Sequence, residues 1–181
     1  KAGKKITQRD MELLLTKTGT DMGNLRMEME KLISYTEGRD VVTAEDIEEI
    51  CTTQTTNRIF DMVRAVTEKN QKRALELYYD LLTLKEPPMR ILFLLAKQYR
   101  QLLLAKQFAA AGLAQTEIAS KLGVPGFVVR NITTCARAYT ISELEQAVKD
   151  FVDAEESVKT GRLEDKLSVE LLIIKYSSKV K

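Results

Sequence analysis

Apolar side chains recur every three or four positions along most of the chain. Such spacing puts them on one face of an α-helix, whereas a half-buried strand would alternate apolar and polar residues. No stretch of alternating β-branched residues is long enough to indicate a strand. Three helical runs are Met22, Leu25, Met29, Leu32 and Ile33; Ala74, Leu77, Tyr78 and Leu81; and Ile141, Leu144, Val148 and Phe151. The sequence therefore predicts an all-α fold of about ten helices.

Glycine and proline mark the expected helix ends. Five glycines each follow a helical run, where a C-capping residue is expected: Gly19, Gly38, Gly112, Gly123 and Gly161. All three prolines precede or open a run, where a missing N–H costs nothing: Pro87, Pro88 and Pro125. We predict six N-capping residues: Thr7, Asp21, Thr43, Asn57, Asn70 and Thr140. Capping-box spacing is also present from Thr43 to Asp46 and from Ser142 to Glu145.

One short segment breaks this pattern. Residues 52–56 read TTQTT, which is uncharged, lacks large apolar side chains and has low helix propensity. We predict a boundary there, with a small three-helix domain over residues 1–52, a linker over 53–56 and a larger helical bundle over 57–181. The longest apolar helix, Pro88 to Ala111, should run through the middle of that bundle.

Composition removes most kinds of chemistry. The chain has no histidine, so imidazole acid–base catalysis and histidine metal sites are excluded. Neither Glu48–Glu49 nor Glu155–Glu156 forms a carboxylate pair, because neighbours on a helix point in different directions. No GxxxxGK[ST] phosphate-binding loop is present. We predict no catalytic residue, cofactor or metal ion.

The two cysteines and the lack of a membrane-length apolar run indicate a reduced, cytoplasmic protein. Cys51 and Cys135 lie among apolar helical neighbours, where we expect them to pack as inert thiols. The chain begins at Lys1 rather than Met, so we expect it to be a piece of something longer.

Charge is unevenly distributed although the net charge is only +2. Residues 89–137 hold seven basic residues and one acidic residue, whereas residues 143–170 hold nine acidic and four basic residues. The two groups could pair within one bundle, serve separate partners, or simply be solvated. Arg90, Lys97 and Arg100 share one helix face and suit phosphates or an acidic partner. These three cations have no interleaved aromatic stacking platform, so they are weak evidence for nucleic acid.

Residues 115–137 resemble a DNA-binding helix–turn–helix. Ala119 would sit where two helices touch, Gly123 would take the turn, and Val124 and Val129 would fill the core. The second helix should then present polar side chains to base edges. It instead begins with GFV, leaving Arg130 and Asn131 suited to such contacts. We therefore favour a structural corner and keep a helix–turn–helix DNA-binding regulator as the alternative.

Several segments, taken in order, resemble the delta subunit of bacterial DNA polymerase III, a clamp-loader subunit. Residues 19–32 (GTDMGNLRMEMEKL) look like its lid domain, and residues 57–63 (NRIFDMV), followed by Ala74–Leu75 and Pro87–Pro88, look like the start of its collar. Residues 94–106 (LLAKQYRQLLLAK) resemble its long central helix. Residues 122–130 (LGVPGFVVR), 159–161 (KTG) and Leu171–Leu172 complete the resemblance, which spans essentially the whole chain.

The resemblance implies an AAA+-type lid followed by a collar domain that holds clamp-loader subunits together. An AAA+-like domain absent from this chain would contact the sliding clamp. Related ATPase subunits carry a nucleotide-sensing Arg near the start of the lid's second helix; here Gly23 holds the matching position, and Arg26 follows within a turn. Glycine at position 23 is what the resemblance implies for a non-hydrolysing subunit of a DNA-directed DNA polymerase (nucleotidyltransferase) complex. A nucleotide site that uses Arg26 is a third alternative.

The resemblance also implies partners: the other loader subunits through the collar, and primer-template DNA through the assembled complex. Candidate contacts with a partner or DNA are Arg90, Lys97, Arg100 and Arg130. Candidate collar-interface residues are Lys159, Gly161 and Arg162. The sequence leaves open whether the Arg90 face meets DNA or protein.

Overall fold

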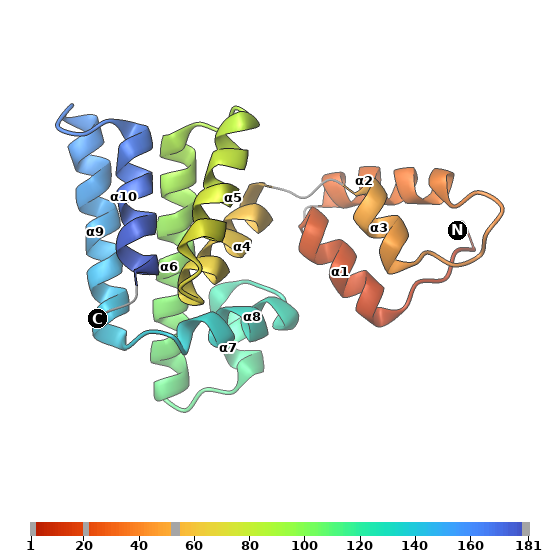
Figure 1. Ribbon diagram of the computed structural model, residues 1–181. Helices are drawn as coiled ribbons and strands as arrows, with labels where there is room; N and C mark the ends of the chain where they lie inside the picture. Colours follow the sequence, from red (N-terminus) through yellow and green to blue (C-terminus); the bar gives the residue numbers. More distant parts are fainter. Residues whose placement is uncertain (1–2, 20–21, 52–54, 179–181) are drawn as a thin grey trace. The chain divides into compact units, whose positions relative to one another are not determined.

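The computed structural model describes residues 3–19, 22–51 and 55–178. These residues form helices that are joined by loops (Figure 1). Its elements are α1 (Gln8–Thr18), α2 (Met22–Tyr35), α3 (Ala44–Ile50), α4 (Thr55–Thr67), α5 (Gln71–Thr83), α6 (Pro88–Ala110), α7 (Gln115–Leu122), α8 (Gly126–Ala136), α9 (Ile141–Lys159) and α10 (Asp165–Ser177). Within the described ranges the only β-type contact is one isolated bridge between Lys5 and Val41. The predicted all-α class is confirmed.

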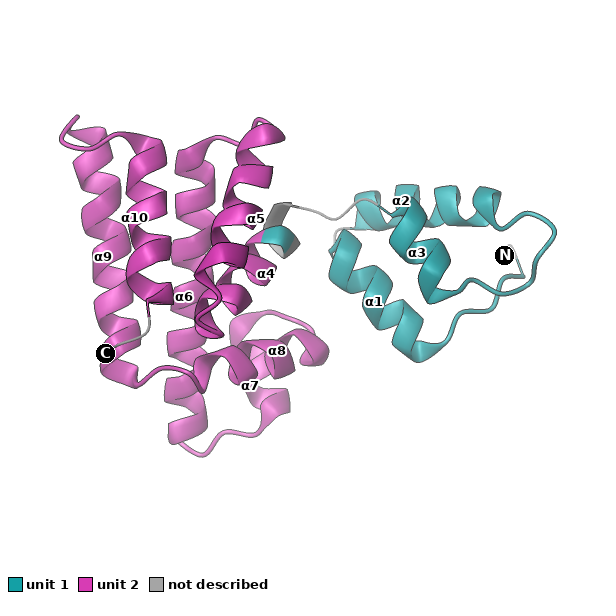
Figure 2. Cartoon of the chain, viewed as in Figure 1, with its two compact units in different colours: residues 1–58 teal, residues 59–181 magenta. Residues whose placement is uncertain are grey.

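The chain divides into two compact units, residues 1–58 and residues 59–181 (Figure 2). Of the predicted linker, residues 53 and 54 lie outside the described residues, as does the predicted N-cap Asp21. α4 begins at Thr55, so the N-cap predicted at Asn57 is wrong. Low helix propensity is a weak preference, and the burial of Ile59, Met62 and Val63 along α4 outweighs it.

Unit 1 packs three helices around a small core formed by Leu14, Leu32, Val42, Ile47 and Cys51. Backbone bonds from Lys5 N–H to Asp40 O (2.8 Å) and from Val42 N–H to Lys5 O (2.9 Å) hold the first residues against the loop between α2 and α3. α3 begins with the predicted Thr43–Asp46 capping box.

In unit 2, α6 occupies the position expected for the central helix. It packs against α7, α8, α9 and α10, while α5 packs against α10 (Figure 1). Its inward face is apolar except for the buried Gln98 and the hydroxyl of Tyr99, and includes Ile91, Leu95 and Leu102. Pro88 is the first residue of α6, as predicted.

Helix ends agree with most sequence predictions. Thr7, Thr43, Asn70 and Thr140 each accept a hydrogen bond from the backbone N–H three residues later. The box predicted at Ser142–Glu145 instead forms at Thr140–Glu143, because α9 begins at Ile141. Gly38 lies beyond the end of α2 at Tyr35 and is therefore no C-cap. Gly123, at φ 64°, ends α7 in the left-handed conformation that favours glycine.

A cluster of aromatic side chains joins the elements of unit 2 around Tyr99 of α6. The Tyr99 ring centroid lies 5.0 Å from that of Phe151, 5.5 Å from that of Tyr176 and 5.8 Å from that of Tyr139. The hydroxyls of Tyr99 and Tyr139 are 3.1 Å apart, within hydrogen-bond distance. Lys69, between α4 and α5, donates to the Tyr176 carbonyl (2.9 Å) and lies over the Tyr139 ring. Burial raises the pKa of Tyr139 to about 12.

We expect Tyr99→Phe and Tyr139→Phe each to lower the free energy of unfolding by about 1–3 kcal/mol, because each leaves a buried hydroxyl without its partner. The double variant should lower the free energy of unfolding by less than the sum of the two single losses, because no buried hydroxyl is then left without a partner. Urea unfolding of the four proteins measures this coupling. Tyr79→Phe, which removes an exposed hydrogen bond to Glu170, is the matched control and should cost less. Strictly additive losses would contradict the coupling.

Stability should also fall in acid because of Asp150. Burial alone would raise the pKa of Asp150, but hydrogen bonds from Lys175, Tyr176 and Gln146 outweigh it and lower the pKa below its usual value. A depressed folded pKa means that the stabilisation is fully present above the unfolded pKa of about 3.9 and disappears as pH falls through the folded pKa. Melting temperatures measured from about pH 6 to about pH 2 should therefore decline less for Asp150→Asn than for the unchanged chain. Asp153→Asn, at an exposed position of the same helix, should follow the unchanged chain.

Candidate interaction surfaces

The outward face of α6 carries the predicted cations and one aromatic side chain. Arg90, Lys97 and Arg100 are all exposed, and the 3.6-residue helical period places them on one face. Phe93 lies on the same face, three residues after Arg90 and four before Lys97, and is 64% exposed. Sequence reasoning missed Phe93 because it sits within the apolar run ILFLLA, which reads as core. Its spacing from the flanking cations was the signal available.

The charge of this face is only partly neutralised. Arg90 is 3.3 Å from Glu86, but within the described ranges neither Lys97 nor Arg100 forms an ion pair. The acidic segment pairs with cations of α9, α10 and their connecting turn: Lys159 with Glu155, Arg162 with Glu156, and Lys175 with Asp150. No ion pair between described residues joins segment 89–137 to segment 143–170. Of the sequence alternatives, internal pairing of the two charged segments is therefore not what the fold adopts.

The candidate collar residues Lys159, Gly161 and Arg162 lie together at the turn between α9 and α10. Lys159 is 2.5 Å from Glu155, and Arg162 is 3.1 Å from Glu156, so both cations are locally paired at the surface. Gly161 has φ 71°. The turn thus offers a compact polar surface, and its role in assembly stays a prediction.

Residues 115–137 form the expected two-helix corner. Ile118, Val129 and Ile132 are buried, and Ala119 and Val124 are partly buried against the same core. α8 packs against both α6 and α7 (Figure 1). Arg130 and Asn131 are exposed, and so is Gly126 at the start of α8. Arg130 therefore lies on its own helix, separate from the set on α6.

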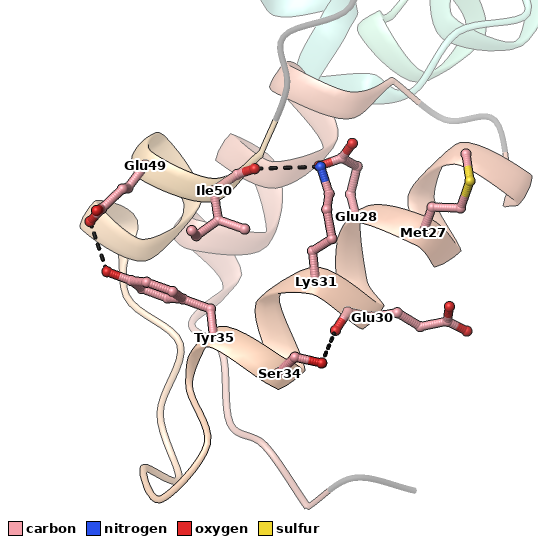
Figure 3. A pocket seen from close by; sticks show the side chains of 8 residues that line it. All are labelled: Met27, Glu28, Glu30, Lys31, Ser34, Tyr35, Glu49 and Ile50. Atoms are coloured by element: carbon pink, nitrogen blue, oxygen red, sulfur yellow. Dashed lines mark hydrogen bonds and ion pairs between the residues drawn. The ribbon is translucent and has the colours of Figure 1, made fainter.

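A shallow groove in unit 1 lies along α2 and the end of α3 (Figure 3). It is lined by Met27, Glu28, Glu30, Lys31, Ser34, Tyr35, Glu49 and Ile50. The Tyr35 hydroxyl donates to Glu49 (2.9 Å), and the Lys31 ammonium lies 2.6 Å from Glu28. Lys31 also reaches the Ile50 carbonyl at 3.5 Å. The bonds from Tyr35 to Glu49 and from Lys31 to Ile50 connect α2 to α3, whereas the Lys31–Glu28 pair lies within α2.

The two lid positions considered for nucleotide sensing, Gly23 and Arg26, are poorly suited to binding a phosphate. Gly23 is the second residue of α2. Arg26 is exposed and pairs with Glu30 one turn later, at 2.9 Å. Glu30 would have to release this guanidinium before it could bind an anion, so the arrangement gives the Arg26 alternative no support.

Neither thiol is set up for chemistry. Burial raises the pKa of Cys51 to about 11 and also raises the pKa of Cys135. Both thiols are therefore protonated near neutral pH and weakly nucleophilic. In the part of the chain that the structure describes, no cluster of three metal-binding side chains occurs, and no helix is long and apolar enough to cross a membrane.

Comparison with known proteins gives consistent matches. The family described as DNA polymerase III delta subunit, C-terminal domain, matches residues 56–176. The DNA polymerase III subunit delta of Bacillus subtilis (strain 168) is 28% identical over 153 residues, 84% of this chain. The probable DNA polymerase III subunit delta of Aquifex aeolicus (strain VF5) is 24% identical over 115 residues, 63% of this chain.

A solved structure shares the fold. The Bacillus subtilis DNA clamp loader delta protein superposes with a TM-score of 0.87 at 26% identity, covering 98% of this chain and 52% of that one. The chain spans 44% and 33% of the lengths of the two curated relatives. These matches give no support to the helix–turn–helix regulator.

We expect the corner formed by α7 and α8 to read no DNA sequence. A selection from random duplexes with the 181-residue chain should return no consensus. Arg130→Ala should leave the relative affinities of different duplexes unchanged, because a base-reading arginine would contribute about 1–3 kcal/mol of discrimination. A consensus that disappears in Arg130→Ala would contradict this expectation.

Proposed function

We propose, from the premise that this chain belongs to the DNA polymerase III delta-subunit family, that it is an assembly portion of a DNA clamp loader. In this proposal unit 2 is a collar that binds the corresponding parts of neighbouring subunits, and unit 1 is an AAA+-type lid. The single observation that carries the proposal is the family match over residues 56–176, which covers nearly all of unit 2.

The surface of unit 2 supports an assembly role. Leu167 and Leu171 are four residues apart on α10 and are 42% and 47% exposed, and Val152 of α9 is 59% exposed. Exposed apolar side chains that share a helix face commonly mark a protein–protein contact. The turn carrying Lys159, Gly161 and Arg162 connects these two helices, so a polar rim beside the apolar residues is part of the proposal.

Unit 1 has too small a core to be strongly stable alone. Five buried apolar residues form that core, and Met22 and Met27 of α2 are exposed. We therefore assign α2 to contact with an AAA+-like domain, which in this family would precede the lid. Contact with the sliding clamp would belong to that domain rather than to the residues described above.

The proposed mechanism is mechanical. ATP-driven rearrangement in neighbouring subunits would be transmitted through rigid helices to load the clamp at primer-template DNA. Such transmission needs packed helices that move as one unit. The contacts of α6 with α7, α8, α9 and α10 make unit 2 such a group of helices. The chain would contribute no bond chemistry itself to the polymerase complex, and it would work in the cytoplasm.

Co-purification with the other clamp-loader subunits tests this proposal. The chain should bind them at micromolar concentration, and Leu167→Glu with Leu171→Glu should weaken the complex at least about tenfold, because two charges would enter an apolar contact. Val41→Glu is the matched control, since Val41 is 47% exposed, belongs to unit 1 and lies outside α2. If residues 57–181 stay separate from the other subunits at micromolar concentration, the collar role is wrong.

A further inference from the structure

The exposed face of α6 combines features that rarely coincide on a surface helix. We call Arg90, Phe93, Lys97 and Arg100 the α6 stripe. All four are exposed, and by the helical period they fall within about 80° of one another around the helix axis. At about 1.5 Å per residue, the stripe extends roughly 15 Å along α6.

Nothing on α6 itself neutralises the stripe. The 23 residues of α6 include no Asp or Glu, and Glu86, which precedes the helix, pairs with Arg90. The other lysine of the helix, Lys106, is already bound, since its ammonium donates to the Ala136 carbonyl at 3.0 Å. Within the described residues, Lys97 and Arg100 therefore keep full positive charge facing water.

Phe93 sets the stripe apart from an ordinary solvated face. Among the described residues of unit 2 it is the most exposed large apolar side chain, although seven residues of the same helix are buried. A large aromatic ring left in water between cations offers a flat apolar surface beside positive charge. The matching ligand presents aromatic faces and regularly spaced negative charges together.

We propose that the α6 stripe binds single-stranded nucleic acid, with a base stacked on Phe93 and phosphates held by Lys97, Arg100 and Arg90. In a duplex the base faces are stacked inside the helix, so Phe93 could reach a base only in an unpaired strand. An acidic protein would suit the cations but gains less from the exposed ring. The inference deepens the proposed function and takes the identity of the DNA from it. The strand that we assign to the stripe is the unpaired template beside a primer.

Fluorescence anisotropy with a labelled oligothymidylate of about 12 nucleotides tests the proposal on the 181-residue chain. Phe93→Ala should weaken binding about 5- to 150-fold, the equivalent of about 1–3 kcal/mol for one stacked base. Phe93→Trp should keep the affinity. Lys97→Ala and Arg100→Ala should each reduce the slope of log K against log salt by about 0.7.

Matched controls lie away from α6. Leu84→Ala, just after α5, removes an apolar side chain of similar exposure, and Lys149→Ala on α9 removes an exposed cation. Neither should change the affinity for oligothymidylate by more than the measurement error. All the substituted positions are exposed, and circular dichroism melting curves check that every variant is folded.

Unchanged affinity in Phe93→Ala would overturn the proposal, even if Arg100→Ala weakens binding, because the stripe would then be a general polyanion surface. Equal affinity for duplex and single strand, insensitive to Phe93, would overturn it in the same way.

The same variants tested for co-purification separate this inference from the proposed function. If Phe93→Ala loses the loader subunits while DNA binding is unchanged, the stripe is a protein contact and the collar role stands. If the chain fails to bind the subunits yet shows the Phe93-dependent binding, the collar role fails and the stripe assignment stands.

Discussion

Tyr99 lies in the middle of α6 with only 1% of its surface exposed, so its hydroxyl must find a partner inside the protein. Tyr139 supplies that partner from the loop before α9, while Phe151 and Tyr176 pack against the ring from α9 and α10. Lys69 adds the turn between α4 and α5 to the same cluster. The contacts of this one buried tyrosine therefore hold α9, α10 and the loop before α9 against α6.

Helical periodicity and end signals predicted most of this architecture. Pro88 opening α6, the Thr43 capping box and the Gly123 turn are local effects that short stretches of sequence determine. The errors came where packing overrides local preference. α4 begins within a polar, threonine-rich segment because the helix buries Ile59 and Met62 further along. The partners of Tyr99 lie far from it in sequence, Tyr139 by 40 residues, so no spacing rule could have paired them.

The candidate site likewise combines features that the local sequence predicts with features that only the packing determines. The three cations of α6 could be placed on one face from their spacing alone, and the structure keeps them there. Their surroundings could not be predicted, because whether the acidic segment neutralises them depends on which side chains the fold brings together. The ion pairs of α9 and α10 stay within those two helices and their connecting turn, which leaves the charge on α6 exposed. Phe93 was missed because apolarity alone does not distinguish a buried position from an exposed one.

The inward and outward faces of α6 are therefore coupled through one rigid helix. Tyr99 is flanked in sequence by Gln98 and Arg100, so fixing the tyrosine ring against α9 and α10 also fixes the direction in which Lys97 and Arg100 leave the helix. A surface supported by a packed helix presents its groups with little conformational entropy left to lose on binding. If neighbouring subunits move the bundle as a unit, the α6 stripe moves with it. Any ligand held by the stripe would then follow the same displacement, so that in the proposed function the movement of the bundle would act on a bound strand.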